Sequence, residues 1–124
     1  MTLLLEAFAA LSDVWRLRIV GLLDEREVCV SDIYSVLGLH QPTASKHLGV
    51  LRRAGLVEVR RQGLWMYYRT SSPTDPAVAG LLRATLDALR RDAVCLADRN
   101  KLDRRSATVV IPQAWHGTDP DFLD

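Results

Sequence analysis

Two helix boundaries that follow each other within a few residues constrain the fold of this chain more than any other feature. Gly38 predicts the end of a short helix whose apolar side carries Ile33 and Val36, because glycine easily takes the left-handed conformation that follows a helix C-terminus. Pro42 fits the first position of a new helix, where its missing N–H group removes no hydrogen bond. The pattern predicts two short helices joined by a tight turn, a helix-turn-helix.

The sequence also indicates where neighbouring helices begin. Ser31 stands at the expected N-cap of the helix that ends at Gly38, where its oxygen can accept a hydrogen bond from a backbone N–H group one turn in. Val28-Cys29-Val30 precedes it as a short extended piece. Ser12-Asp13 supplies a cap for an earlier helix, and residues 4–11 recur at helical spacing before it.

Two strand-like segments follow the helix that starts near Pro42. Residues 56–60 and 64–69 alternate or are rich in strand-forming side chains, and Arg61-Gln62-Gly63 separates them, which predicts a hairpin. A helix-turn-helix followed by a hairpin with a basic tip is a winged helix. The predicted fold class is mainly α with a small β-hairpin, a dimeric winged helix-turn-helix.

The C-terminal third of the chain predicts the dimer. Asp75-Pro76 is a good start for a long helix, which we expect to run to about Leu102. Such a helix carries more apolar surface than a small domain needs, so a homodimer through the N-terminal and the long C-terminal helices is expected. Residues 1–103 are predicted to form one DNA-binding and dimerisation domain, and residues 104–124 a loosely ordered tail.

A basic segment hides behind the net charge of +1. Residues 41–69 carry six basic residues and one acidic residue, which gives +5 and leaves −4 for the remainder of the chain. A basic block on an otherwise acidic protein indicates a surface for a polyanion. For any single arginine the alternative is a solvated charge.

The polar side of the helix that starts near Pro42 carries side chains suited to base edges and phosphates, because Ala44, Leu48 and Leu51 occupy its apolar side. The residues predicted to contact double-stranded operator DNA are Gln41, Thr43, Ser45, Lys46 and His47 on this helix and Arg60, Arg61 and Gln62 on the wing. Ser45 and His47 lie two residues apart and do not face each other on a helix. Without a carboxylate pair or a Gly-rich phosphate loop either, no enzyme activity is predicted.

These motifs resemble those of a known family. Residues 13–19, DVWRLRI, resemble the DPTRLRIL stretch of ArsR/SmtB-type winged-helix repressors, and residues 37–69 resemble their recognition helix and wing. The combination QPTxSxHLxxLxxAGLVxxRRxGxxxxYR is highly specific, and the resemblance covers about residues 5–102. It implies a homodimeric, cytoplasmic transcriptional repressor that leaves DNA when an inducer binds.

Within this family, arsenic-type members carry CVC at the start of the helix before the recognition helix, often inside ELCVCDL. Residues 27–33 read EVCVSDI, so Cys29 keeps the first thiol and Ser31 replaces the second. The resemblance implies Cys29 as the sensing thiol and an arsenic(III) species as inducer, with no organic cofactor. Arsenite is usually held by three thiolates. Cys29 and Cys95, within one chain or across the dimer, would instead make a two-thiolate metal site that suits a methylated trivalent arsenical.

Several alternatives stay open. Cys29 and Cys95 are also explained as small buried residues, or as a thiol redox or sulfide sensor of the same fold. No histidine lies between residues 75 and 104 for a zinc or nickel site, whereas His116, Asp119 and Asp121 in the tail could bind a borderline metal. A winged-helix module for protein partners is the alternative from another class. Two unpaired cysteines favour a reducing cytoplasm, and no run of apolar residues is long enough for a membrane span.

Overall fold

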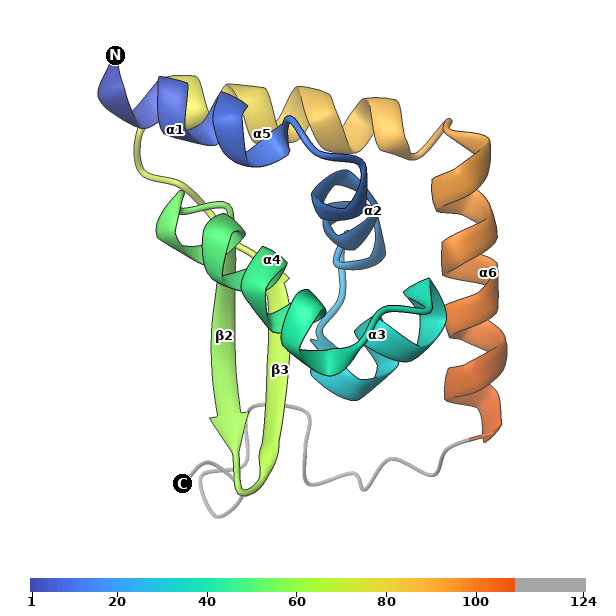
Figure 1. Cartoon of the computed structure of the whole chain (residues 1–124). Helices are drawn as coiled ribbons and strands as arrows, with labels where there is room; N and C mark the ends of the chain where they lie inside the picture. Colours follow the sequence, from blue (N-terminus) through green and yellow to red (C-terminus); the bar gives the residue numbers. More distant parts are fainter. Residues whose placement is uncertain (109–124) are drawn as a thin grey trace.

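The computed structural model describes residues 1–108, which form six helices and three strands (Figure 1). In chain order these are α1 (Thr2–Leu11), α2 (Val14–Leu22), β1 (Val28–Cys29), α3 (Val30–Leu37), α4 (Gln41–Arg53), β2 (Val57–Gln62), β3 (Trp65–Thr70), α5 (Pro76–Leu89) and α6 (Ala93–Thr108). The predicted winged helix-turn-helix is confirmed, with α3 and α4 as the helix pair and β2–β3 as the wing.

Helix α2 lies at the centre of this arrangement. Ile19, Val20, Leu22 and Leu23 have no exposed surface, and α2 is in contact with every other helix of the described chain. Asp13 caps α2 as predicted, because its carboxylate accepts hydrogen bonds from the backbone N–H groups of Trp15 (2.9 Å) and Arg16 (3.1 Å). Full burial of one aliphatic side chain stabilises the fold by about 1.5–3 kcal/mol. These four residues therefore form the centre of the hydrophobic core.

The helix-turn-helix follows the sequence signals at its turn but not at its start. Gly38 ends α3 with a φ of 69°, and Pro42 lies in the first turn of α4. The predicted N-cap at Ser31 is wrong, because α3 begins at Val30 and Cys29 is the N-cap residue. Cys29 has the extended backbone conformation typical of an N-cap, but its side chain makes no cap hydrogen bond to the helix.

The sheet is antiparallel, with the strand order β1-β3-β2. The hairpin turn holds only Gly63 and Leu64, since Gln62 pairs with Trp65. Arg61 and Gln62 therefore belong to β2. The prediction that they form part of the turn is wrong. Strand β1 adds to the other edge of β3, where Cys29 lies opposite Tyr67.

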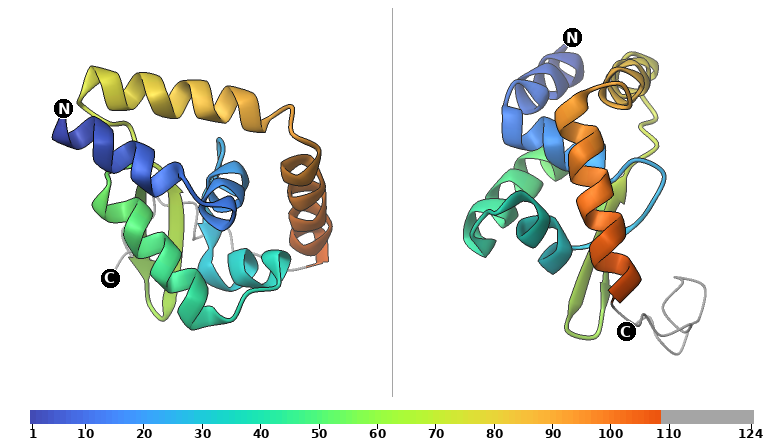
Figure 2. Two further views of the ribbon diagram at one scale, coloured as in Figure 1. Left: turned by 45° about the horizontal axis from the view of Figure 1, so that its top comes forward. Right: turned by 90° about the vertical axis from the view of Figure 1, so that its right-hand side faces the viewer.

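The prediction of one long C-terminal helix is wrong. The chain turns after α5, and a new helix starts where the Asp92 carboxylate accepts hydrogen bonds from the backbone N–H groups of Val94 (3.0 Å) and Cys95 (3.1 Å). Figure 2 shows α6 running at an angle to α5, and it packs along α2 and α3. The helix continues to Thr108, beyond the predicted domain boundary at residue 103, and residues 109–124 of the predicted tail lie outside the described part.

Ion pairs hold α6 against the rest of the domain. The Arg18 guanidinium donates two hydrogen bonds to Asp98 (2.9 and 2.8 Å), and this contact raises the pKa of Arg18. Arg26 donates to Asp103 (2.7 Å). Asp98 is 6% exposed, so its pair is the one that is largely removed from water.

Helix α1 leaves apolar side chains in solvent. Leu3, Leu5 and Phe8 are each more than half exposed, and α1 lies alongside α5 (Figure 1). Among residues 1–108, no helix has the length and apolar character needed to cross a membrane.

Two of the ion pairs of α6, Arg18–Asp98 and Arg26–Asp103, predict unequal effects on stability. Asp98→Ala is expected to lower the free energy of unfolding by about 2 kcal/mol, because it removes two charge-assisted hydrogen bonds from a half-buried guanidinium. Asp103→Ala is the matched control, with an expected change within about 0.5 kcal/mol, since Asp103 is 58% exposed. Urea denaturation at one protein concentration measures both, and equal losses would contradict the assignment.

Candidate nucleic-acid interface and cysteine sites

Helix α4 has one buried side and one polar exposed side. Ala44, Leu48 and Leu51 have no exposed surface, as the sequence predicted. Four of the five predicted contacts on this helix are exposed: Gln41, Thr43, Ser45 and Lys46. Arg52 and Arg53 are exposed in the last turn of the same helix. The exposed side therefore offers hydrogen-bonding groups and positive charge without an acidic residue.

His47, the fifth predicted residue on α4, is half-buried. Its Nδ1 atom lies 3.3 Å from Nη1 of Arg16, which belongs to α2. The two residues are 31 positions apart, so no local sequence pattern could have indicated this contact.

The wing residues differ in where they point. Arg60 donates two hydrogen bonds to Glu27 (3.0 and 3.1 Å), and its guanidinium lies over the ring of Tyr67, 5.1 Å from the centroid. Gln62 is 1% exposed and accepts a hydrogen bond from Arg60 (2.7 Å). Arg61 is exposed and donates to the carbonyl of Gly63 (3.1 Å).

Of the three wing residues predicted to contact DNA, Arg61 is exposed, Arg60 is partly buried in its ion pair, and Gln62 is buried. Residues 60 and 62 share one face of β2 and residue 61 occupies the other, because side chains alternate along a strand. The sequence could have predicted this alternation. It was not applied to residues 61 and 62 because they were predicted to lie in the turn.

Cys29 lies at a junction between the sheet and the helix-turn-helix. It is 8% exposed, ends β1 and precedes α3. Its Sγ atom is 3.3 Å from Oγ of Ser31, and Tyr67 is its partner across the sheet. Burial raises the pKa of Tyr67 to about 12, so this phenol keeps its proton at neutral pH.

Cys95 lies in a different environment, between α6 and α2. It is 2% exposed, and its Sγ atom is 3.1 Å from where a Cβ atom on Gly21 would be. Burial raises the pKa of Cys95 to about 11, which keeps the thiol neutral. A Cβ atom on Gly21 would press against this sulfur, so the environment is that of a packing residue.

The structure does not bring the two cysteines of one chain together. Arg105 donates to Asp32 at the start of α3 (2.6 Å), which puts the far end of α6 near Cys29. Cys95 lies ten residues earlier on α6, about 15 Å along the helix axis. Within residues 1–108 no group of three or more His, Cys, Asp or Glu side chains could hold a metal ion. The tail residues His116, Asp119 and Asp121 lie outside the described part.

Comparison with known proteins gives consistent matches. The sequence model of the family described as "Bacterial regulatory protein, arsR family" matches residues 13–59. The arsenic resistance transcriptional regulator ArsR1 of Pseudomonas putida is 38% identical over 96 residues, which cover 73% of this chain and 75% of that protein. The arsenical resistance operon repressor of Escherichia coli is 46% identical over 76 residues, which cover 60% of this chain and 64% of that protein.

A solved structure agrees with the sequence matches. A homodimeric winged helix-turn-helix DNA-binding domain from Mycobacterium bovis, described as a possible ArsR-family transcriptional regulator, is 33% identical with a TM-score of 0.61. The match covers 74% of this chain and 82% of that domain. The names of these relatives describe DNA-binding regulators of transcription, in agreement with the prediction of no enzyme activity. With its helix pair, its wing and these relatives, the chain belongs to the ArsR family of bacterial transcriptional regulators.

Proposed function

We propose that the protein is a homodimeric repressor that binds operator DNA through α4 and the wing, and that a trivalent arsenic species bound at Cys29 releases it. The observation that carries this proposal is the position of Cys29, which is the last residue of β1 and the N-cap of α3. A ligand on this sulfur acts on the wing sheet and on the helix-turn-helix at one point. The cytoplasmic location expected from the free thiols is part of the same proposal.

The exposed side of α4 supports the DNA-binding part. Gln41 and Thr43 lie in its first turn, where backbone N–H groups are also free to meet a phosphate. Lys46 lies one turn further, and Arg61 on the wing adds a second cation. Phosphate contacts set the position of the helix, and the shorter polar side chains suit base edges in a major groove.

The exposed apolar side chains of α1 support the dimer. Leu5 and Phe8, three residues apart on α1, form an exposed apolar patch, and such patches on small domains mark contact surfaces. A two-fold dimer buries the same patch of both chains, and the similar domain from M. bovis is described as homodimeric. We therefore expect the dimer interface to include α1 and its neighbour α5.

The names of the P. putida and E. coli relatives support arsenic as the inducer. Each chain has one thiol at this junction, because Ser31 replaces the second and Cys95 is remote. Methyl groups already occupy coordination positions of a methylated arsenical, so it requires fewer protein thiolates than arsenite does. We therefore expect a methylated trivalent arsenical to be the stronger inducer of the two.

Cys29→Ser is expected to leave operator binding unchanged and to abolish release by the arsenical, because oxygen is a poor ligand for this soft element. Fluorescence anisotropy of labelled promoter DNA, titrated with arsenite and with a methylated trivalent arsenical, measures both properties. Cys95→Ala is the matched control and is expected to keep the response, since Cys95 is a packing residue. Release that persists in Cys29→Ser would move the sensing site elsewhere.

The DNA surface predicts a second set of variants. Lys46→Ala and Arg61→Ala should each weaken operator binding and reduce the slope of log K against log salt concentration by about 1, as expected when one phosphate contact is lost. Lys101→Ala on the exposed side of α6 is the control and should change neither quantity. An affinity insensitive to salt between about 50 and 200 mM would argue for a protein-binding module instead.

The thiol redox or sulfide alternative is tested in the same titration. Cys29 lies near the Arg105 end of α6, whereas Cys95 lies about 15 Å away along that helix, which is too far for a direct bond within one chain. Release by an oxidant, with a dimer linked through Cys29 on a non-reducing gel, would replace arsenic by redox sensing.

A further inference from the structure

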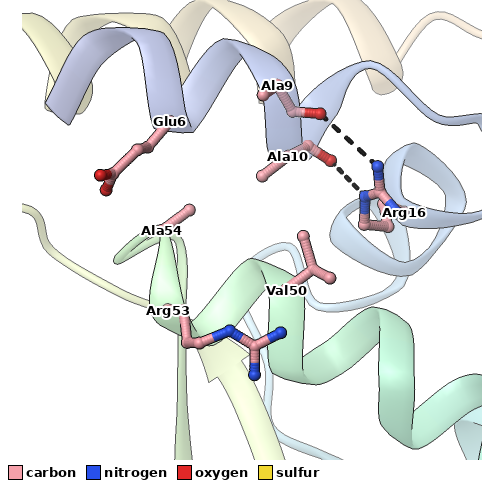
Figure 3. A pocket seen from close by; sticks show the side chains of 7 residues that line it. All are labelled: Glu6, Ala9, Ala10, Arg16, Val50, Arg53 and Ala54. Atoms are coloured by element: carbon pink, nitrogen blue, oxygen red, sulfur yellow. Dashed lines mark hydrogen bonds between the residues drawn. The ribbon is translucent and has the colours of Figure 1, made fainter. Parts of the chain in front are cut away.

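The side chain of Arg16 connects three helices. From α2, its Nε atom donates to the carbonyl of Ala10 (2.6 Å) and Nη2 donates to the carbonyl of Ala9 (3.5 Å), both at the end of α1 (Figure 3). Its Nη1 atom lies 3.3 Å from Nδ1 of His47 on α4. The side chain is only 18% exposed, so this position is defined by its partners.

The contact with His47 fixes where the imidazole carries its proton. A guanidinium only donates hydrogen bonds, so Nδ1 of His47 accepts one only when it is unprotonated. A neutral imidazole with an accepting Nδ1 carries its hydrogen on Nε2. The ring atom on the far side from Arg16 is then a hydrogen-bond donor.

The contact with α1 satisfies atoms that the helix cannot. The last carbonyl groups of a helix lack partners within it, and a cation beside them is also favourable for the helix dipole. Arg16 supplies both for Ala9 and Ala10. Helix α1 also carries the exposed patch of Leu5 and Phe8, so the same guanidinium touches the helix proposed for the dimer and the helix proposed for DNA.

A groove separates α1 from α4 beside Arg16, and Arg16 connects the two helices at one end of it. The groove has a volume of about 540 Å³ and lies between the Glu6 side of α1 and the Arg53 side of α4 (Figure 3). Arg16 lines it at the end where α1 stops.

We propose that Arg16 is a positioning residue for operator recognition. It holds His47 as an Nε2–H donor for an acceptor on DNA, a phosphate oxygen or a purine N7, and it fixes the position of α4 relative to α1. The proposal rests on the proposed function, since it requires α4 to be the helix that meets DNA. Arg16 lies on α2, so the proposal adds to DNA recognition a residue outside the exposed side of α4.

The first test is the tautomer of His47 in the free wild-type protein. Long-range ¹⁵N NMR of the histidine rings distinguishes the two neutral forms, and the signals missing from His47→Ala assign the ring. The Nε2–H form is expected in the wild type and a mixture of both forms in Arg16→Lys, whose single ammonium group cannot span both partners. An Nδ1–H ring in the wild type overturns the proposal, including in the case that Arg16→Lys does not fold.

The second test is a double-mutant cycle on operator affinity. Arg16→Lys and His47→Ala are each expected to weaken binding about tenfold, the order of one charge-assisted hydrogen bond. If Arg16 acts through His47, the double variant should bind within about twofold of His47→Ala alone. Multiplicative losses would show that Arg16 acts independently of His47. Wild-type protein that fails to bind its promoter would instead refute the proposed function, so the two failures are distinguishable.

Discussion

The burial of α2 is the constraint on which the rest of the described chain depends. Its C-terminal half is removed from water, with Ile19, Val20 and Leu22 fully buried, and α1, α3, α4, α5 and α6 each contact the helix. A helix surrounded in this way cannot shift without shifting its neighbours, because protein interiors are close-packed. The patch on α1 and the polar side of α4 therefore have a common reference, although they belong to helices far apart in sequence.

The two arginines of α2 form polar contacts with the neighbouring helices. Arg18 reaches α6 through Asp98, and Arg16 reaches α1 and α4 through two carbonyls and an imidazole. Both guanidinium groups are planar donors that span two acceptors, which a lysine does not reproduce. The DVWRLRI stretch thus combines a buried helix with two lateral connections, which gives a physical reason for both arginines.

The sequence was sufficient for features that depend on neighbouring residues. Gly38 and Pro42 defined the helix-turn-helix, and Asp13 defined the start of α2. The turn before α6 was missed because apolar residues continue at helical spacing on both sides of it, so periodicity outweighed the cap at Asp92. The partner of Arg60 was missed for another reason. Glu27 is 33 positions away, and only the pairing of β1 with β3 brings that segment to the wing.

The two cysteines also differ in whether neighbouring residues or distant contacts determine their environment. Local sequence identified the place of Cys29, whereas the role of Cys95 depended on the direction of α6. With the helix turned, Cys95 meets Gly21 on α2, and its thiol stays neutral in a site closed to solvent. Both thiols are buried. We nevertheless expect ligand binding at Cys29, which ends a strand, and only packing at Cys95, which lies in a helix contact.

In the proposed mechanism, two routes converge on α4. One runs from Cys29 through α3, and the other from α1 through Arg16 and His47. A dimer binds half-sites about one helical turn of DNA, ~34 Å, apart, so a small change in the position of either recognition helix affects both half-sites. Coupling free energies of such switches are about 1–3 kcal/mol, which is the magnitude of a single charge-assisted hydrogen bond. A switch of this size therefore requires no refolding, because the loss of one well-placed contact at α4 is enough.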